Sequence, residues 1–300
     1  MIKRLAVYFR EMFPLVQRIG ISYLLFFEIY FLVLLTKGKF IFNFGIPEIV
    51  GGFTVFGFLL FLRVADDFKD YETDTKLFPE RPLPSGRVTK NDLKGLLIVD
   101  VLLMIVLNYF FMNNFGWFLF LMIYGALMSF WFFAKTKIQK SLPLALITHN
   151  PIQLIINAYI ISFTCLKYNI EIWQYTNIVI LFALYFDGLI WEIGRKVRAP
   201  EEETEYVTYS KLFGVKKVVT FIMLIMGFDL IANILMVKEL SPIAMIGPVL
   251  GFMWFANECL RFIRNPREFK LITLIEKYMV GTEGYIIIWL LITYFLALVG

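Results

Sequence analysis

Apolar residues gather along this chain in long runs, which are separated by short charged segments. A helix needs about 20 mostly apolar residues to cross a bilayer. Nine runs approach or reach that length, and each predicts a membrane-spanning helix. The predicted spans are 19–36, 45–63, 94–112, 115–134, 142–165, 173–191, 215–236, 242–262 and 279–299. The pattern therefore predicts an all-α polytopic membrane protein with about nine transmembrane helices.

The distribution of basic residues tests this count, because the spans follow from hydropathy and not from charge. Segments on the cytoplasmic side of a membrane are enriched in Lys and Arg. With a cytoplasmic N-terminus, one side of the membrane receives 25 of the 29 basic residues, and the other side receives four. The cytoplasmic segments are then 1–18, 63–94, 135–141, 192–217 and 261–278. We therefore expect an integral membrane protein whose two longest polar loops, 63–94 and 192–217, face the cytoplasm.

Composition supports the same class. Hydrophobic residues make up 59% of the chain and charged residues only 18%, whereas soluble domains average about 25% charged residues. This balance excludes a disordered chain and a nucleic-acid-binding protein. The two cysteines, Cys165 and Cys259, lie far apart in apolar runs. We expect buried thiols and neither a zinc site nor a disulfide.

The first 18 residues mix basic and apolar side chains, and they contain no apolar core of a signal peptide. This pattern is typical of a helix that lies on the membrane surface. We expect segment 1–18 to be an amphipathic cytoplasmic lead-in to a single transmembrane domain over 1–300.

The strongest candidate for chemistry is an acidic cluster in segment 63–94. It contains Asp66, Asp67, Asp70 and Asp74. On a helix, the last three would share one side, where like charges repel each other. A divalent cation relieves such repulsion, and carboxylate oxygens suit Mg²⁺, which prefers one or two carboxylates together with phosphate oxygens. The spacing indicates a site for a Mg²⁺-bound phosphate or diphosphate. The alternative is a solvated acidic helix end.

The same segment continues with Pro79, Pro82 and Pro84, which surround Arg81 and precede Gly86. Prolines favour extended, rigid backbone. We expect an extended segment that holds Arg81 over the acidic cluster, with a simple turn before the next span as the alternative.

Together these residues resemble the first signature of the UbiA superfamily of intramembrane prenyltransferases. That signature is an Asn/Asp-Asp-x-x-Asp-x-x-x-Asp cluster followed by Arg-Pro-Leu-Pro-Ser-Gly, and it matches residues 66–74 and 81–86. Asp66 stands where many members have Asn. The resemblance covers essentially the whole chain. It implies nine helices around a central chamber, with motif loops after the second and the sixth span.

The second signature of the family departs from the usual pattern. Members carry Tyr, then Lys-Asp-x-x-Asp. Here Glu192 fits the first acid, Arg195 replaces the second, and Asp187 falls near the Tyr position. On a helix, Glu192, Arg195 and Lys196 share a face that Asp187 does not. Either Glu192 holds a second Mg²⁺ while Arg195 and Lys196 bind diphosphate, or the acid and the bases pair with each other. We expect the neighbouring acids 201–203 to be solvated.

The resemblance implies a set of roles for these residues. Asp67, Asp70, Asp74 and Glu192 would be catalytic. The metal ligands would be Asp66, Asp67, Asp70, Asp74, Asp187 and Glu192, with Mg²⁺ as the cofactor. The diphosphate would be bound by Arg63, Arg81, Lys135, Lys137, Arg195 and Lys196. For the two lysines of the basic loop 135–141, a purely topological role is the alternative.

Polar residues inside the spans raise a separate question, because they are costly in a membrane unless they are paired or face a cavity. The chain has a single histidine, His149, so a histidine-based metal site is excluded. Asn150, Gln153, Asn157 and Asn257 are candidates for an acceptor pocket. Hydrogen bonding between helices is the alternative.

The function expected from the sequence is therefore Mg²⁺-dependent transfer of a prenyl group from an isoprenoid diphosphate to an aromatic or other lipophilic acceptor within the membrane lipid. A terpene cyclase of the same superfamily is the main alternative, because the second signature is atypical. A transporter or lipid-binding protein fits less well, since its charges would be spread through the spans. A CDP-alcohol phosphotransferase is disfavoured, because Asp187-Gly188 lacks the Ala-Arg and the paired aspartates that follow in that family.

Overall fold

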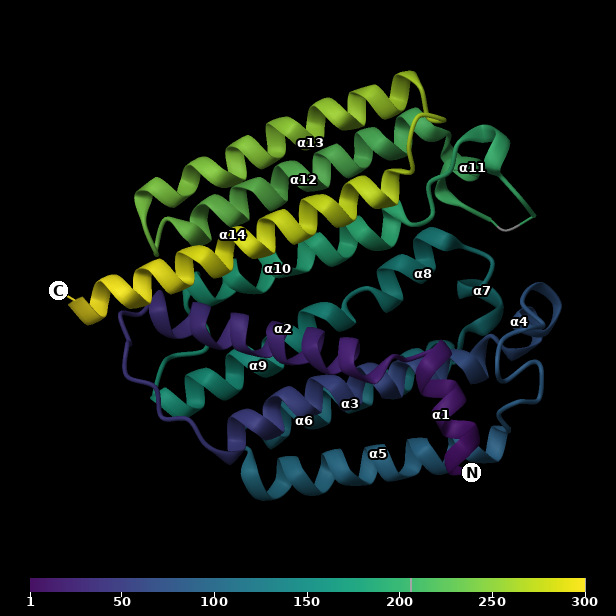
Figure 1. Ribbon diagram of the computed structural model, residues 1–300, viewed down its shortest axis with the longest axis horizontal. Coiled ribbons are helices and arrows are strands. Elements are labelled where there is room, and N and C mark those ends of the chain that lie inside the picture. Colours follow the sequence, from purple (N-terminus) through teal and green to yellow (C-terminus); the bar gives the residue numbers. More distant parts are fainter. Residues whose placement is uncertain (206, 300) are drawn as a thin grey trace. The chain divides into compact units, whose positions relative to one another are not determined.

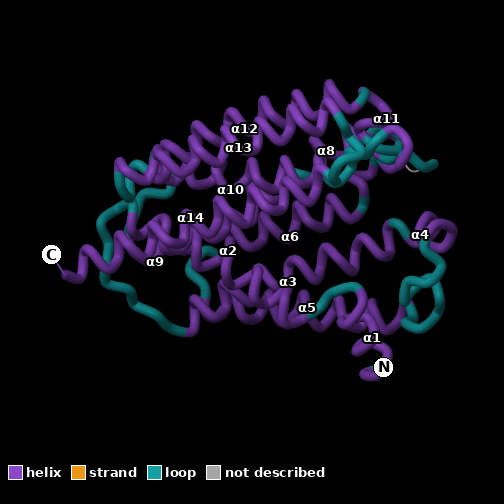
Figure 2. The backbone as a smooth tube through the Cα atoms, turned by 45° about the horizontal axis from the view of Figure 1, so that its top comes forward, coloured by secondary structure: helices purple, strands orange, loops and turns teal. Residues whose placement is uncertain are grey.

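The computed structural model describes residues 1–205 and 207–299, and this part of the chain is helical with no strand (Figures 1 and 2). Eight helical segments are long and apolar enough to cross a membrane. They are Leu15–Leu35, Ile46–Lys69, Lys90–Phe111, Leu142–Tyr168, Tyr175–Gly194, Val215–Val237, Pro242–Arg264 and Leu271–Val299. The predicted all-α, multi-span class is confirmed. Eight of the nine predicted spans coincide with these segments.

The ninth predicted span, 115–134, is only partly helical. Its helix α6 (Phe115–Ser129) has 15 residues, which is short of the length that a bilayer crossing needs. Three consecutive aromatic residues, Trp131–Phe133, follow it with positive φ angles between 49° and 57°. This left-handed backbone is costly for residues with a Cβ atom. The apolar run therefore continues in sequence where the helix has already ended.

Several helix ends also differ from the prediction. Helix α3 (Ile46–Lys69) runs six residues past the predicted end at residue 63, and α14 (Leu271–Val299) begins eight residues before residue 279. Polar residues continue a helix readily because its hydrogen bonds are made by the backbone, so a drop in hydropathy does not mark a helix end. The fifth span is divided into α8 (Leu142–His149) and α9 (Ile152–Tyr168) at Pro151, which lacks the backbone N–H that a helix interior needs.

The chain forms two compact units. Unit 1 contains Met1–Tyr30, Asn43–Lys135 and Ser162–Ile170, and unit 2 contains Phe31–Phe42, Thr136–Ile161 and Glu171–Gly300. Helices α2 (Leu15–Leu35), α7 (Lys135–Ile138) and α9 contribute to both. The acidic cluster belongs to unit 1, and the second motif belongs to unit 2.

In unit 1, α3 packs along α5 (Lys90–Phe111) and against α6, and these helices lie side by side in Figure 1. The two main helices approach closely at Gly57, where an added Cβ would lie 2.8 Å from Met104 Sδ. The amphipathic helix α1 (Ile2–Glu11) forms at the predicted place and reaches α5. A buried cluster that includes Tyr8, Val64 and Leu83 joins α1, α3 and the loop before α5.

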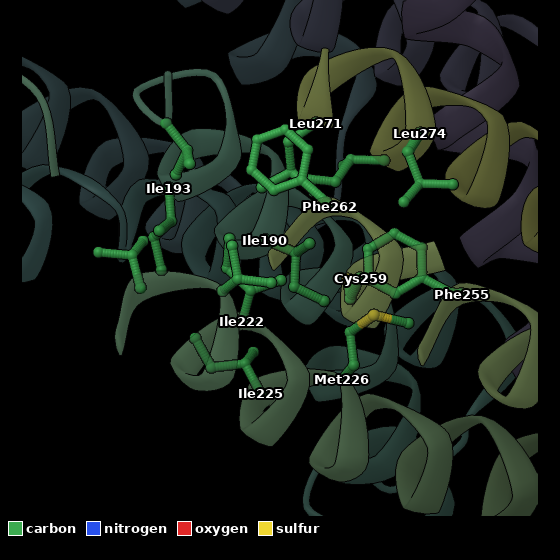
Figure 3. Close-up of a cluster of buried hydrophobic side chains, with 14 of the residues drawn as sticks. Ile190, Ile193, Ile222, Ile225, Met226, Phe255, Cys259, Phe262, Leu271 and Leu274 are labelled. Atoms are coloured by element: carbon green, nitrogen blue, oxygen red, sulfur yellow. The ribbon is translucent and has the colours of Figure 1, made fainter. Parts of the chain in front are cut away.

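In unit 2, α10 (Tyr175–Gly194), α12 (Val215–Val237), α13 (Ile246–Arg264) and α14 pack side by side (Figure 1). Their shared core includes Ile190, Ile222 and Phe255 (Figure 3). Short elements complete the unit, namely η2 (Pro200–Glu202), α11 (Tyr209–Phe213) and η3 (Pro242–Met245). Cys259 lies in this core and Cys165 is buried in unit 1, so the predicted burial of both thiols is confirmed.

Candidate functional site

The acidic cluster lies where α3 ends and the short helix α4 (Tyr71–Leu77) begins. The helix breaks at Asp70, whose φ is −100° and ψ is 7°. The expectation that one continuous helix face carries Asp67, Asp70 and Asp74 is therefore wrong. The turn is nevertheless compact, because the backbone N–H of Asp70 donates to Asp66 O at 2.8 Å and that of Asp74 donates to Asp70 O at 2.8 Å.

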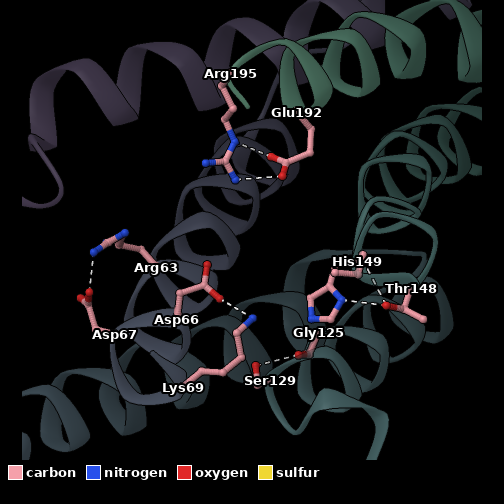
Figure 4. A network of polar contacts seen from close by, with 11 residues as sticks. Arg63, Asp66, Asp67, Lys69, Gly125, Ser129, Thr148, His149, Glu192 and Arg195 are labelled. Carbon is pink, nitrogen blue, oxygen red and sulfur yellow. Dashed lines mark hydrogen bonds and ion pairs between the residues drawn. The ribbon is translucent and has the colours of Figure 1, made fainter. Parts of the chain in front are cut away.

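Three of the four acids pair with a cation. Lys69 Nζ lies 2.8 Å from Asp66, and Arg81 Nη1 lies 2.7 Å from Asp74. Arg63 binds Asp67 one helical turn away, and Figure 4 shows this pair together with the Asp66 pair. Asp67 and Asp74 are buried. The cluster is thus a set of carboxylates that are held in place by bases of the same segment.

Asp70 is the exception. It makes no ion pair within the described part of the chain, and it is half-buried. Burial raises the pKa of the Asp70 carboxyl, and the nearby carboxylates of Asp66 and Asp74 raise it further, against an opposing effect of Lys69. Asp70 is therefore the acid whose charge is least compensated, and it is the one that would gain most from a bound cation.

The proline-containing segment forms a series of turns. Ser85 N donates to Arg81 O at 3.0 Å, and Val88 N donates to Pro82 O at 3.0 Å. The turns close at Gly86, whose φ of 76° suits glycine. The predicted extended backbone is wrong, and the turn alternative holds. The predicted placement of Arg81 over the acidic cluster is nevertheless found, since its guanidinium contacts Asp74 and stacks 4.0 Å from the centre of the Phe78 ring.

The N-terminal helix contributes a residue that sequence reasoning missed. Tyr8 is fully buried, and its hydroxyl donates to Asp67 Oδ2 at 2.6 Å. Burial, with the Asp67 carboxylate beside it, raises the pKa of Tyr8, so that the phenol keeps its proton and remains a donor. Asp67 is therefore held from two sides, by Tyr8 and by Arg63. Tyr8 falls on the apolar stripe of the predicted amphipathic helix, which predicts packing but does not identify the partner.

Two further contacts fix α1 against the motif segment. Arg4 makes a two-pronged contact with the buried Asp92 at 2.6 and 2.8 Å, and Asp92 accepts from the backbone N–H of Thr89 to cap α5. Arg87 donates to both oxygens of Glu11 at 2.5 and 2.8 Å. The hydrogen bond from Arg87 lowers the pKa of Glu11. Helix α1 is thus bound to α5 through Arg4 and to the turn segment through Glu11.

The donor set of the cluster fits Mg²⁺ in one particular mode. Among the described residues, no three Asp, Glu, His or Cys side chains are arranged as a ready-made metal cage. Mg²⁺ does not need such a cage in phosphate-binding sites, where one or two carboxylates act together with substrate oxygens and water. The less compensated Asp70, flanked by Asp66 and Asp74, offers such a partial set.

The second motif is arranged differently. Glu192, near the end of α10, accepts from Arg195 Nε at 2.6 Å and Nη2 at 2.9 Å, and Lys196 Nζ lies 3.0 Å away (Figure 4). The three residues share a face as expected. The pairing favours the second alternative of the sequence analysis, in which the acid and the bases neutralise each other. Asp187 does not join them.

Asp187 lies deeper in unit 2, where it is 3% exposed. Asp229 of α12 and Glu283 of α14 are acidic residues close to it. Asp229 in turn accepts from Tyr278 and from Asn233, both at 2.9 Å. The structure therefore separates the two predicted second-motif metal ligands, Asp187 and Glu192.

The acids after α10 are not a uniformly solvated run. Glu202 is exposed as expected. Glu203, in contrast, accepts from Thr208 at 2.6 and 2.7 Å and from Ser210 at 2.5 Å, and Glu201 pairs with Arg267. Glu203 closes the loop that leads to α11, because it bridges two residues of that helix start.

The remaining candidates divide into exposed and internally bonded residues. Lys135 and Lys137 are exposed on α7, and Asn257 is exposed on α13. Gln153 donates to Asn157 Oδ1 at 3.2 Å, and Asn157 donates to Leu181 O at 3.3 Å. For this last pair, hydrogen bonding within and between helices is what the structure contains. Asn150, at the end of α8, has a buried side-chain oxygen that accepts no hydrogen bond from the described residues.

Comparisons with known proteins give one informative match. No protein-family model matches the sequence, and no curated protein matches it. The structure resembles that of a digeranylgeranylglyceryl phosphate synthase in membranes, with a TM-score of 0.68 and 15% sequence identity over 96% of this chain and 98% of that chain. The chain therefore shares the fold of that membrane enzyme, and its eight membrane-length helices support an integral, multi-pass membrane protein.

Proposed function

We propose that this protein is a Mg²⁺-dependent intramembrane prenyltransferase, which moves a prenyl group from an isoprenoid diphosphate to a lipophilic acceptor. One observation carries the proposal. Within a prenyltransferase fold, four aspartates gather where a membrane-length helix ends, in the segment that resembles the first UbiA signature. Charge positioned at a membrane surface suits a substrate with a diphosphate head and an apolar tail.

In this proposal, Asp66, Asp67, Asp70 and Asp74 would hold Mg²⁺, which when bound supplies positive charge to the leaving diphosphate. Arg63 forms an ion pair with Asp67 of this cluster, and Arg81 forms one with Asp74. An incoming diphosphate offers more negative charge than a single carboxylate, and the planar guanidinium suits phosphate oxygens. We therefore propose that both arginines bind the diphosphate while Tyr8 keeps Asp67 in place.

Cations outside the first motif would contribute further. We propose that Arg195 and Lys196, together with Lys135 and Lys137 of the basic loop, bind the diphosphate as well. Glu192 then acts first as the partner that keeps Arg195 and Lys196 oriented. The alternative, in which Glu192 or Asp187 binds a second Mg²⁺, is less favoured because Glu192 is paired with two bases.

The chemical step would be ionisation of the carbon–oxygen bond to the diphosphate. The electron pair of that bond leaves with the diphosphate, whose charge the arginines and lysines compensate. The resulting allylic cation is attacked by an electron-rich acceptor, which then loses a proton. Aromatic rings stabilise cations, and 18% of this chain is aromatic. Asn150, Gln153, Asn157 and Asn257 remain the proposed acceptor contacts, with Asn150 best placed to bond because of its unpartnered oxygen.

The test uses the full-length protein in nanodiscs with Mg²⁺ and prenyl diphosphates of ten to twenty carbons, with EDTA as a control. Diphosphate release that requires an added aromatic or lipid acceptor supports transfer. Mg²⁺-dependent release without an acceptor, with a cyclic hydrocarbon or alcohol as product, supports the cyclase instead. If neither reaction occurs with any chain length, the proposal fails although the fold stands.

A further inference from the structure

Unit 2 contains a cavity of about 370 Å³ that the proposed reaction does not use as a whole. It lies beside the second motif, between the loop after α10, the end of α13 and the start of α14. Its wall is formed by Arg195, Arg198, Lys270, Phe262, Phe269 and Leu271, among others. The volume falls in the range of about 300–1,000 Å³ that is usual for small-molecule sites.

The cavity wall carries an excess of positive charge. Arg198, Lys270 and Arg195 line it, and Glu202 is the acid among the lining residues. Glu192, which is not a lining residue, pairs with Arg195, so that Arg198 and Lys270 are the further lining cations beside the single lining acid Glu202. Arg198 is oriented by a hydrogen bond to Thr204 Oγ1 at 3.1 Å. Such a wall favours an anionic ligand.

The floor of the cavity is apolar. Phe262 and Leu271 are almost fully buried there. The Phe262 ring packs against Phe269, with 5.6 Å between the ring centres. Leu271 and Ile272 begin α14, where the backbone N–H of Thr273 donates to Lys270 O at 3.1 Å. The ligand that this wall and floor would fit is an anion with an apolar part attached.

The position of the cavity at the ends of three helices indicates the same class of ligand. It adjoins the end of α10 at Gly194, the end of α13 at Arg264 and the start of α14 at Leu271. Three membrane-length helices therefore end or begin at its wall, and the ends of helices of this length are expected close to the lipid headgroups. Basic pockets at this level, on the side of the membrane that carries basic loops, suit anionic headgroups.

We propose that this cavity binds an anionic phospholipid, with its phosphate on Arg198 and Lys270 and its glycerol region on Phe262 and Phe269. A free phosphate shares the charge but would leave the apolar floor uncovered, so the lipid is the ligand we infer. The proposal does not depend on the proposed prenyl transfer, because neither Arg198 nor Lys270 belongs to the predicted motif residues.

The experiment measures the thermal melting of the full-length detergent-purified protein after addition of phosphatidylglycerol, phosphatidylcholine or inorganic phosphate. Native mass spectrometry counts the lipid molecules that remain bound. The test variant is R198Q/K270Q. The control is K216Q/K217Q, which removes two exposed cations at the start of α12. We expect phosphatidylglycerol to raise the melting temperature more than phosphatidylcholine does, and R198Q/K270Q to lose at least half of that difference while the control retains it.

Three results would overturn the proposal. The first is an equal response of both variants to phosphatidylglycerol, which means that general surface charge causes the effect. The second is an equal response of the unchanged protein to inorganic phosphate, which means an anion site without lipid selectivity. The third is the absence of any phosphatidylglycerol response in the unchanged protein. If R198Q/K270Q fails to fold, the single variant K270Q, at an exposed position, serves in its place. No readout here uses prenyl transfer, so failure of the proposed function leaves this test intact.

Discussion

The two motif regions of this protein use the same residue types in different proportions. At the end of α3, four aspartates meet Arg63, Lys69 and Arg81, and Asp70 is left without an ion pair within the described part of the chain. At the end of α10, one glutamate meets two cations, since Glu192 is contacted by both Arg195 and Lys196. The first region has a surplus of negative charge, and the second has a surplus of positive charge.

This difference assigns the two regions different tasks. A surplus of carboxylates is relieved by binding a divalent cation, whereas a surplus of guanidinium and ammonium groups is relieved by binding an anion. A substrate that consists of a metal-bound diphosphate needs both. Under the proposed function, Arg195 in place of the expected acid therefore favours anion binding over metal binding in the second region.

The largest expected effect tests this division directly. Replacement of Asp70 by Ala should lower Mg²⁺-dependent diphosphate release by about 100-fold or more, because it removes the least compensated carboxylate of the cluster. Replacement of Glu192 by Ala should lower it by less than about five-fold, because in the proposed function Glu192 orients Arg195 and Lys196 and does not bind the metal. The exposed acid Glu72 on the same segment provides a matched control, E72A, that should leave the rate unchanged. Equal losses of rate in D70A and E192A would contradict the division of tasks, because they would show that both regions do the same thing.

A smaller effect is expected from Tyr8, which belongs to the first region only through tertiary structure. Y8F removes the hydroxyl that donates to Asp67 and keeps the ring that packs in the core. Residues that orient a metal ligand typically change metal affinity by about 10–100-fold. We expect about ten-fold more Mg²⁺ to be needed for half-maximal rate. Weaker Mn²⁺ binding, measured by electron paramagnetic resonance without substrate, should accompany this change. An unchanged Mn²⁺ affinity in a folded Y8F protein would contradict the positioning role.

Sequence and structure agree on the elements that depend on local pattern. Hydropathy places eight of the spans, and the mixture of basic and apolar residues in segment 1–18 predicts the amphipathic helix α1. The disagreements arise where a tertiary contact or the backbone decides. The contact between Tyr8 and Asp67 joins residues 59 positions apart. The helix break at Asp70 has no signal in the carboxylate spacing, which fits a continuous helix equally well.

The second region shows the same limit in a different form. The sequence predicts that Glu192, Arg195 and Lys196 share a helix face, and they do. It does not decide between pairing and metal binding, because both arrangements use the same face. Glu203 was expected to be solvated because it lies in a run of acids, yet Thr208 and Ser210 fold back onto it. Such a loop closure depends on residues that follow the acid and not on the acid itself.

The dependence on pH sharpens the comparison further. The pKa of Asp70 is raised by burial and by the neighbouring carboxylates, so Asp70 takes up a proton at a pH at which ordinary aspartates are still ionised. Metal binding needs the carboxylate form, and it should therefore weaken as the pH falls, beginning above the ordinary aspartate pKa of about 3.9. Mn²⁺ binding between pH 4 and 7 measures this. D70N should bind more weakly throughout and should lose the acid-side decline. If the decline in Mn²⁺ binding at low pH persists in D70N, a group other than Asp70 causes it.

The smallest expected effect concerns the two ion pairs, Glu11–Arg87 and Arg4–Asp92, that hold α1 against the segment of the first motif. Glu11 and Arg87 are both exposed, so E11Q should lower the melting temperature by less than about 2 °C. R4Q should lower it more, because it removes the partner of the buried Asp92. Since Arg87 lowers the pKa of Glu11, that contact should persist on acidification until the pH falls below the ordinary glutamate pKa of about 4.3. If E11Q proved as destabilising as R4Q, the exposed Glu11–Arg87 contact would stabilise the protein as much as the partly buried Arg4–Asp92 contact. Helix α1 would then be held against the acidic cluster along its whole length, and not mainly through Arg4 and Tyr8.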